Sequence, residues 1–173
     1  MPGSIGFVPD EADYVSASLA NCRCQLRKSA LWIRLALSAA GLAVLAAVIL
    51  ADDIIEGLII VAASAAAGFL AGLICIAVSY LLLPRRSRRI YRQQRSLRQE
   101  QRVAWDDSRL HWEGPGFTMD VPWSDYHRWH ESRAEFLLYV NEQMPHFLPR
   151  RAMDEDQAAD LRATLVAHGP PRR

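Results

Sequence analysis

The fold of this chain is decided by residues 31–83, which read LWIRLALSAAGLAVLAAVILADDIIEGLIIVAASAAAGFLAGLICIAVSYLLL. Two stretches of this block, 31–51 and 57–83, contain no charged side chain apart from Arg34. An α-helix needs about 20 apolar residues to cross the hydrocarbon core of a bilayer. Each stretch has that length, and the second can cross with some tilt. The sequence therefore predicts a two-helix transmembrane hairpin over residues 30–83.

Charged residues around the hairpin set its expected orientation. The connection between the two stretches contains only acids, namely Asp52, Asp53 and Glu56. Both outer flanks are basic, with Arg23, Arg27 and Lys28 before the hairpin and Arg85, Arg86, Arg88, Arg89 and Arg92 after it. Basic flanks remain on the cytoplasmic side of a membrane. We therefore expect both termini in the cytoplasm and the acidic turn outside.

Small residues recur at every fourth position in both stretches. They are Ala39, Ala43 and Ala47 in the first stretch and Ser64, Gly68 and Gly72 in the second, with Ala67, Ala71, Cys75 and Ser79 beside them. Such stripes let helix backbones approach closely in lipid. The main interpretation is that the hairpin packs against itself, and the alternative is the contact face of a homodimer or of another membrane protein.

Residues 84–101, PRRSRRIYRQQRSLRQEQ, predict a basic juxtamembrane helix. Each arginine near the membrane surface is worth about 1 kcal/mol of attraction to anionic lipid headgroups. We therefore expect Arg85, Arg86, Arg88, Arg89 and Arg92 to contact such lipids. The formal net charge is only +1, and the segment has Tyr91 as its single aromatic residue and no nucleic-acid-binding motif. These features argue against a nucleic-acid partner.

The N-terminal segment, residues 1–29, predicts a cytoplasmic helix over 11–28 that is capped by Asp10, with Asp13 at the third helical position. No basic region followed by a short apolar core starts at Met1, so a cleaved signal peptide is not expected. Cys22 and Cys24 are too close in sequence for an unstrained disulfide and are expected as reduced thiols.

From residue 102 to 173 the hydrophobic period changes to near two, which predicts short antiparallel strands. The expected strands are 103–106, 110–113, 117–121, 126–131, 136–140 and 147–150. Asp154 is the expected cap of a final helix that ends before Gly169. The fold class is thus a membrane α+β protein, in which a small β-meander is closed by a C-terminal helix. In so small a domain we expect Trp123 to belong to the core.

No residue set in this domain predicts catalysis, a metal or a cofactor. Ser124, Asp125 and His127 are too close in sequence to form a triad without other elements, and His127 and His130 point to opposite faces of a strand. Arg150 and Arg151 are the better functional candidates, since paired guanidiniums bind a phosphate or a carboxylate. The alternative is that they pair with acids of the last helix, namely Asp154, Glu155 or Asp156.

Two motifs carry a family resemblance. The segments VPWSDY (121–126) and FLPRRAM (147–153) resemble the "W-S-D-hydrophobic" and "I-P-K-R-A-F" segments of the YcxB-like family of bacterial membrane proteins, with Arg150 in place of the lysine and Met153 in place of the aromatic residue. The resemblance implies a pleckstrin-homology-like (PH-like) C-terminal domain and a location in the bacterial cytoplasmic (inner) membrane. It implies no activity and no catalytic residues.

Together these features predict a membrane-anchored, non-enzymatic interaction module. Its PH-like domain is held at the inner leaflet and binds a protein partner or acidic lipid. Two alternatives are a subunit of a larger membrane complex and a membrane-tethered hydrolase or metal enzyme.

Overall fold

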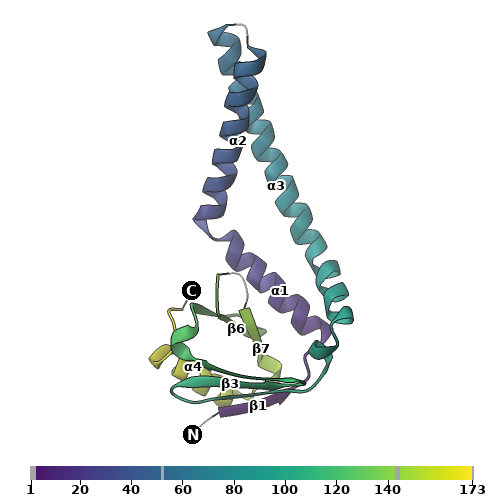
Figure 1. Ribbon diagram of the computed structural model, residues 1–173, viewed down its shortest axis with the longest axis vertical. Helices are drawn as coiled ribbons and strands as arrows, with labels where there is room; N and C mark the ends of the chain where they lie inside the picture. Colours follow the sequence, from purple (N-terminus) through teal and green to yellow (C-terminus); the bar gives the residue numbers. More distant parts are fainter. Residues whose placement is uncertain (1–2, 52, 143–144, 173) are drawn as a thin grey trace. The chain divides into compact units, whose positions relative to one another are not determined.

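The computed structural model describes residues 3–51, 53–142 and 145–172 (Figure 1). Asp52 of the predicted acidic turn and Arg173 at the predicted end of the domain lie outside these ranges. The chain divides into two compact units. One unit combines Met1–Asn21 with Leu83–Arg173, and the other is Cys22–Leu82.

The unit Cys22–Leu82 is helical. It contains the end of α1 (Glu11–Leu26), all of α2 (Ser29–Leu50) and most of α3 (Ile54–Gln93). By length and composition, α2 and α3 are each able to cross a membrane. Their large apolar side chains are mostly exposed within the chain, as in Val48 and Ile54, whereas a soluble core would bury them.

Small residues lie where α2 meets α3. Ala39 and Ala43 are buried, although most side chains of α2 are exposed. A Cβ atom added to Gly68 would lie 3.6 Å from the Cβ of Ala39, and one added to Gly72 would lie 2.3 Å from Cδ1 of Leu35. The helices therefore approach most closely along the stripe that contains Gly68 and Gly72. The neighbouring stripe is exposed, and its residues are Ala67, Ala71, Cys75 and Ser79.

The basic segment after Pro84 is a continuation of α3, which ends at Gln93. A separate helix over 84–101 is therefore not observed. A short 3₁₀ helix, η1 (Arg95–Arg98), follows, and Gln99 is already extended. The physical reason is that Gln101 pairs with Phe7 in a sheet, which requires an extended chain soon after the helix ends.

The strands of the described ranges form two antiparallel sheets instead of the single meander that the sequence predicted. The first sheet has the order β1 (Gly3–Phe7), β2 (Gln101–Trp105), β3 (Arg109–Gly114) and β4 (Phe117–Pro122). The second has the order β5 (Arg128–Glu131), β6 (Glu135–Tyr139) and β7 (Pro145–Pro149). A 3₁₀ turn, η2 (Trp123–Asp125), separates β4 from β5.

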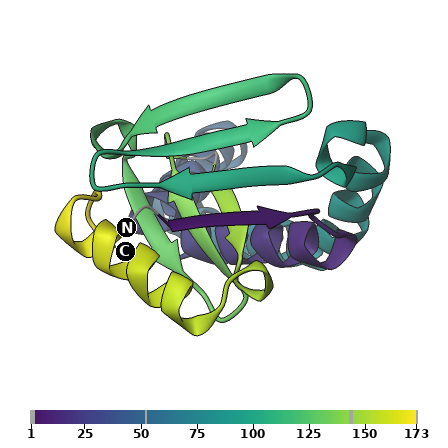
Figure 2. The ribbon, with the colours of Figure 1, turned by 90° about the horizontal axis from the view of Figure 1, so that it is seen from below.

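Strand β1 was not predicted, because Gly3 and Gly6 are poor strand formers. It forms through non-local pairing, in which Ile5 lies opposite Val103 of β2. Figure 2 shows β1, in purple, along the edge of the first sheet. A Cβ atom added to Gly3 would lie 2.2 Å from Cε2 of Trp105, so glycine is needed for this close approach. Residues 1–29 are thus not a separate segment, since their first part completes the C-terminal domain.

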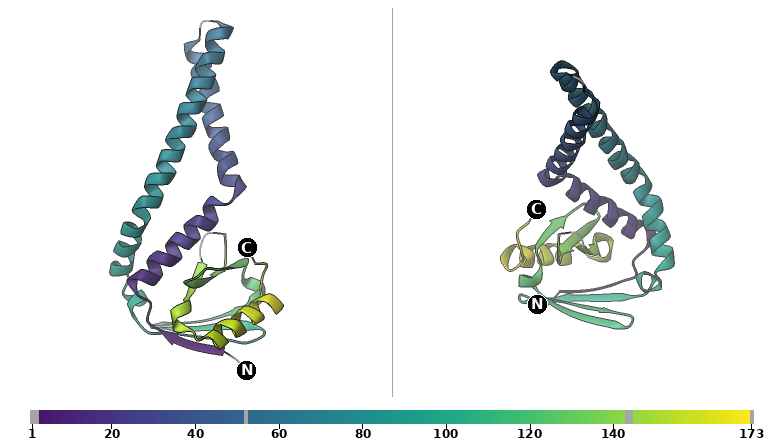
Figure 3. Two further views of the ribbon diagram at one scale, coloured as in Figure 1. Left: turned by 180° about the vertical axis from the view of Figure 1, so that it is seen from behind. Right: turned by 45° about the horizontal axis from the view of Figure 1, so that its top comes forward.

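The core of the domain lies between the sheets and α4 (Glu155–Ala167), which appears in yellow in Figure 3. The part of α1 that belongs to this unit covers the other face of the second sheet, where Ala17 and Ala20 pack on Leu137 and Tyr139. Asp154 caps α4 as predicted, in a capping box with Gln157. The core residues contributed by α4 are Ala158, Leu161 and Leu165.

Candidate functional site

The predicted lipid-contacting arginines of α3 fall into two groups. Arg88 and Arg92 lie one helical turn apart and both contact Glu11 in the first turn of α1, with Nε to carboxylate distances of 3.5 Å and 3.0 Å. The remaining three are exposed, and the described part of the chain supplies no carboxylate to them; these are Arg85, Arg86 and Arg89. The positive charge of the segment is therefore partly neutralised within the domain, and partly open to solvent.

Arg151 ties two distant segments together. Arg151 is the second residue of η3 (Arg150–Ala152). Its guanidinium binds Asp13 through Nε at 2.9 Å and through Nη2. Nη2 also donates to the carbonyl of Val8 at 3.0 Å and lies 3.4 Å from Asp10. The hydrogen bonds with Asp13 raise the pKa of Arg151. Its partners are acids at the start of α1, whereas the sequence interpretation placed them at the start of the last helix.

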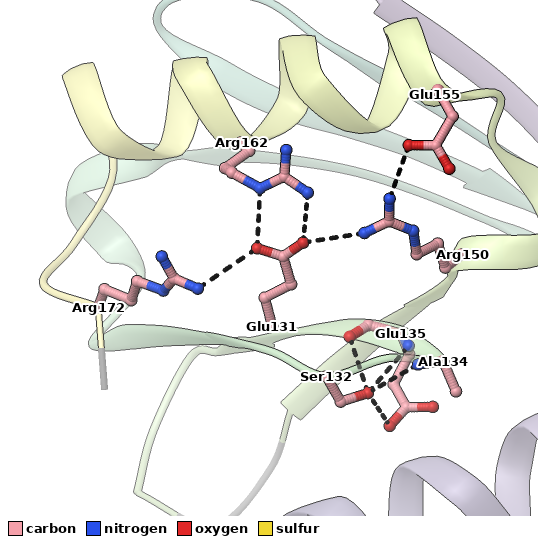
Figure 4. A network of polar contacts seen from close by, with 8 residues as sticks. All are labelled: Glu131, Ser132, Ala134, Glu135, Arg150, Glu155, Arg162 and Arg172. Carbon is pink, nitrogen blue, oxygen red and sulfur yellow. Dashed lines mark hydrogen bonds and ion pairs between the residues drawn. The ribbon is translucent and has the colours of Figure 1, made fainter.

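Arg150 has one predicted partner and one that sequence reasoning missed. Its Nη2 donates to Glu155 at 2.9 Å, which is the pairing expected at the start of α4. Its Nη1 donates to Oε1 of Glu131, the last residue of β5, at 3.1 Å (Figure 4). A ligand at Arg150 would therefore compete with carboxylates of the chain.

Glu131 is the centre of an arginine cluster, defined here as Arg150, Arg162 and Arg172. Arg162 of α4 makes a bidentate contact, with Nε donating to Oε2 at 2.9 Å and Nη2 donating to Oε1. Arg172 of the C-terminal tail reaches Oε2 at 3.5 Å. The side chain of Glu131 is only 10% exposed. The hydrogen bonds from Arg162, followed by the charges of the three arginines, lower the pKa of Glu131.

The tail that carries Arg172 is anchored on β5. The N–H of Trp129 donates to the carbonyl of Pro171 at 3.3 Å, and Trp129 and Arg172 form an isolated parallel bridge. The guanidinium of Arg172 lies over the Trp129 ring, 4.9 Å from its centroid, which is a cation–π contact. Glu131, Arg162 and Arg172 share no local sequence pattern, so only tertiary structure could identify this cluster.

Arg128, at the start of β5, is buried and lies 4.1 Å from the centroid of the Tyr139 ring. Its Nη2 makes a long contact of 3.4 Å with the carbonyl of Glu142, and its Nε has no hydrogen-bond partner. The Tyr139 ring therefore adds a cation–π contact to this buried cation.

An open depression of about 310 Å³ lies on the outer face of the first sheet. Its floor contains small residues such as Gly6 and Ala104, and its walls include His111 and Glu113. His111 lies between Asp120, at 2.7 Å from Nδ1, and Glu113, at 3.1 Å from Nε2. The hydrogen bond with Asp120, followed by that with Glu113, raises the pKa of His111.

The residues considered for catalysis are not assembled into a site. Oγ of Ser124 contacts Oδ1 of Asp125 at 3.3 Å in the exposed turn η2, and His127 is exposed. Trp123, the predicted core residue next to them, is buried and donates from Nε1 to the carbonyl of Asp106 at 2.8 Å. Within the ranges that the structure describes, no group of three or more His, Cys, Asp or Glu residues is arranged to hold a metal ion.

Comparison with known protein families shows a similarity in the C-terminal part of the chain. The family model described as YcxB-like protein matches residues 105–165, from the end of β2 to near the end of α4. The two motifs that carry the resemblance, 121–126 and 147–153, both lie inside this region. No curated protein matches the chain, and no solved structure matches it. The chain is therefore similar to YcxB-like proteins over most of its C-terminal strands and its last helix.

Proposed function

We propose that this protein is a membrane-anchored, non-enzymatic interaction module of the bacterial cytoplasmic membrane. The hairpin of α2 and α3 crosses the membrane, and both ends of the chain are cytoplasmic. The domain of two sheets and α4 is a reduced PH-like domain that meets anionic lipid headgroups or a protein partner at the inner leaflet. A subunit role in a larger membrane complex is the alternative, and the exposed small-residue stripe of α3 favours it.

The observation that carries this proposal is the pairing of β1 with β2. These strands are hydrogen-bonded neighbours, yet α1, α2 and the whole of α3 lie between them in the sequence. Two strands of one sheet must be on the same side of a membrane, and a hairpin of two spans meets that condition. The basic flanks of the hairpin favour the cytoplasmic side.

Electrostatics supports contact with anionic lipid. Arg85, Arg86 and Arg89 follow directly after the apolar part of α3 and are exposed. Arg88 and Arg92 instead contact Glu11 and so help to hold α3 against the start of α1. The first group is therefore available to lipid headgroups, and each of its charges is worth about 1 kcal/mol near the membrane surface.

The strand arrangement supports the PH-like assignment. A four-stranded and a three-stranded antiparallel sheet, followed by a C-terminal helix, enclose one core. The YcxB-like match covers β3 to β7 and most of α4. Here the first strand is supplied from the N-terminal side of the hairpin, which links the domain to the membrane through two connections.

Cysteine labelling tests the anchoring. In a variant with Cys22, Cys24 and Cys75 changed to Ser, a single cysteine is introduced as Asp53→Cys or Ser124→Cys. A membrane-impermeant maleimide should label the first in intact cells and the second only after lysis. Labelling of Ser124→Cys in intact cells would contradict the proposed orientation.

Energy transfer tests the lipid contact. The full chain, carrying a donor dye at Ser124→Cys, is reconstituted in nanodiscs with acceptor-labelled lipid and increasing fractions of phosphatidylglycerol. Transfer should rise with the anionic fraction, and the triple change of Arg85, Arg86 and Arg89 to Gln should reduce that rise. High salt should also reduce it, because salt screens exposed charges. If energy transfer does not depend on the anionic fraction, contact with anionic lipid is contradicted and a protein partner remains as the proposed ligand.

A further inference from the structure

The arginine cluster around Glu131 has more positive charge than its acids can neutralise. Three guanidiniums from η3, α4 and the C-terminal tail meet one carboxylate that is 10% exposed (Figure 4). Arg150 has a second acid, Glu155, but that side chain is 89% exposed. Three cations thus share two carboxylates, of which one is almost fully in solvent, where its charge is strongly screened.

The cluster also has unused hydrogen-bond donors. The donors that contact Glu131 are Nη1 of Arg150, Nε and Nη2 of Arg162, and Nη2 of Arg172. Among the described residues, none accepts a hydrogen bond from Nη1 of Arg162 or from Nε and Nη1 of Arg172. Both side chains are open to solvent, at 34% and 58% exposure. An anion can therefore enter beside Glu131 without the core being opened.

The third arginine is not needed to join α4 to β5. The bidentate contact of Arg162 already joins α4 to β5. Arg172 adds another cation at the longest distance of the set, 3.5 Å, and this addition increases repulsion among the guanidiniums. Its position over the Trp129 ring holds it beside the cluster. The cluster therefore holds a surplus of positive charge beside Glu131.

We propose that Arg150, Arg162 and Arg172 form a binding site for a phosphate group, with Glu131 as the internal carboxylate that occupies part of the site when no ligand is bound. Phosphate carries several acceptor oxygens and accepts paired N–H donors from arginine. The inference rests on the proposed function and deepens it, because it assigns the ligand-binding residues of the domain to the contact between α4, η3, the C-terminal tail and the end of β5. The phosphate group belongs to a lipid headgroup or is free in solution.

The site does not fit a nucleotide base or a single-stranded nucleic acid. Base recognition uses an accessible aromatic face, whereas the Trp129 ring is 1% exposed and lies under Arg172. The recognisable chemistry is therefore that of the phosphate group itself.

Calorimetry with inorganic phosphate tests the proposal on the full chain in uncharged detergent. Titration is carried out at constant ionic strength, with chloride as the reference anion. We expect saturable phosphate binding that is about tenfold weaker in Arg172→Gln, as for the loss of one charge-assisted hydrogen bond. The matched control is Arg133→Gln, an exposed arginine of the same domain outside the cluster, which should bind phosphate like the unchanged protein.

Changing Glu131 gives the opposite expectation. Glu131→Gln removes the competing negative charge, so phosphate affinity should rise by several-fold at temperatures where this variant is folded. If phosphate binding is absent, or if Arg172→Gln and Arg133→Gln bind equally, the proposal is wrong. Arg172→Gln keeps the test decisive even if Glu131→Gln does not fold, since Arg172 lies in the exposed tail.

A displacement experiment with lipid distinguishes the two sources of the phosphate group. Short-chain phosphatidic acid, which presents a phosphomonoester, is added to the phosphate-bound protein in micelles, with phosphatidylglycerol at matched charge as the control. Displacement of phosphate by phosphatidic acid alone assigns the site to a lipid headgroup, and no displacement assigns it to free phosphate. Changing Arg85, Arg86 and Arg89 to Gln should leave phosphate binding in detergent unchanged, so failure of the surface contact and failure of this site are separate results.

Discussion

Ile5 lies opposite Val103 in the register of β1 and β2, although the complete hairpin of α2 and α3 separates the two residues in sequence. Both side chains are buried in the core of the domain. The hairpin is therefore an insertion between two neighbouring strands of one sheet. Folding of the domain requires both ends of the hairpin to be brought together.

This pairing predicts that the N-terminal strand stabilises the C-terminal domain. Ile5→Ala should lower the free energy of unfolding by about 2–4 kcal/mol, because it removes buried methylene groups and leaves a cavity. Ser4→Ala, on the exposed face of the same strand, is the matched control and should change it by less than about 0.5 kcal/mol. Thermal unfolding in detergent, followed by near-UV circular dichroism, measures both. Equal melting temperatures for the two variants would show that β1 is dispensable.

The burial of Trp123 leads to a second prediction about the stability of the domain. Trp123→Ala should lower the free energy of unfolding by about 3–5 kcal/mol, since the ring is 2% exposed and packs near Tyr126. Trp123→Phe keeps a ring but loses the hydrogen bond to the carbonyl of Asp106, so we expect a smaller loss, of about 1 kcal/mol from the hydrogen bond. A cooperative melt that is unchanged in Trp123→Ala would instead identify Trp123 as a surface residue.

The buried position of His146 leads us to expect that the folded protein loses stability in mild acid. It lies against Trp112 and near Tyr126, and burial lowers its pKa. The folded state therefore binds a proton less readily than the unfolded state, in which the pKa is about 6.5. Stability should be fully present above that pKa and should decrease as the pH falls below it. Measured melting temperatures between pH 7.5 and pH 5 should fall less in His146→Gln than in the unchanged protein.

His111 should show the opposite dependence and serves as the comparison. Its pKa is raised by Asp120 and Glu113. Its contribution to stability is therefore present below the unfolded pKa and is lost as the pH rises through the folded pKa. His111→Gln should leave the acid-side fall intact. If His111→Gln removed that fall and His146→Gln did not, the assignment of the two histidines would be reversed.

The contact between α2 and α3 predicts which glycine changes are tolerated. Gly68→Ala places its Cβ at ordinary van der Waals distance from Ala39 and should be accepted, whereas Gly68→Leu should force the helices apart. Ala67→Leu is the control on the exposed stripe of the same helix. Distances between spin labels on α2 and α3 should increase only for Gly68→Leu. A loss of self-association for Ala67→Leu would indicate that the exposed stripe is a contact between copies.

The sequence alone determined the features that depend on local composition. Two long uncharged stretches predicted the helices that became α2 and α3, because apolar length is a local property. Asp154 predicted the start of α4, because a cap satisfies backbone N–H groups only two or three residues away. Strands β3 to β7 were predicted to within about two residues at their ends, since their alternation is visible in short windows.

Only the tertiary structure decided the features that depend on distant pairing. Strand β1 has too weak a local preference to be recognised, and its formation depends on β2, which lies beyond the hairpin. The division of the strands into two sheets depends on the turn at Trp123, where local sequence predicted one continuous meander. The partners of Arg151 and the cluster around Glu131 come from segments far apart in the chain. An ion pair depends on where side chains end in space, and no local pattern encodes that position.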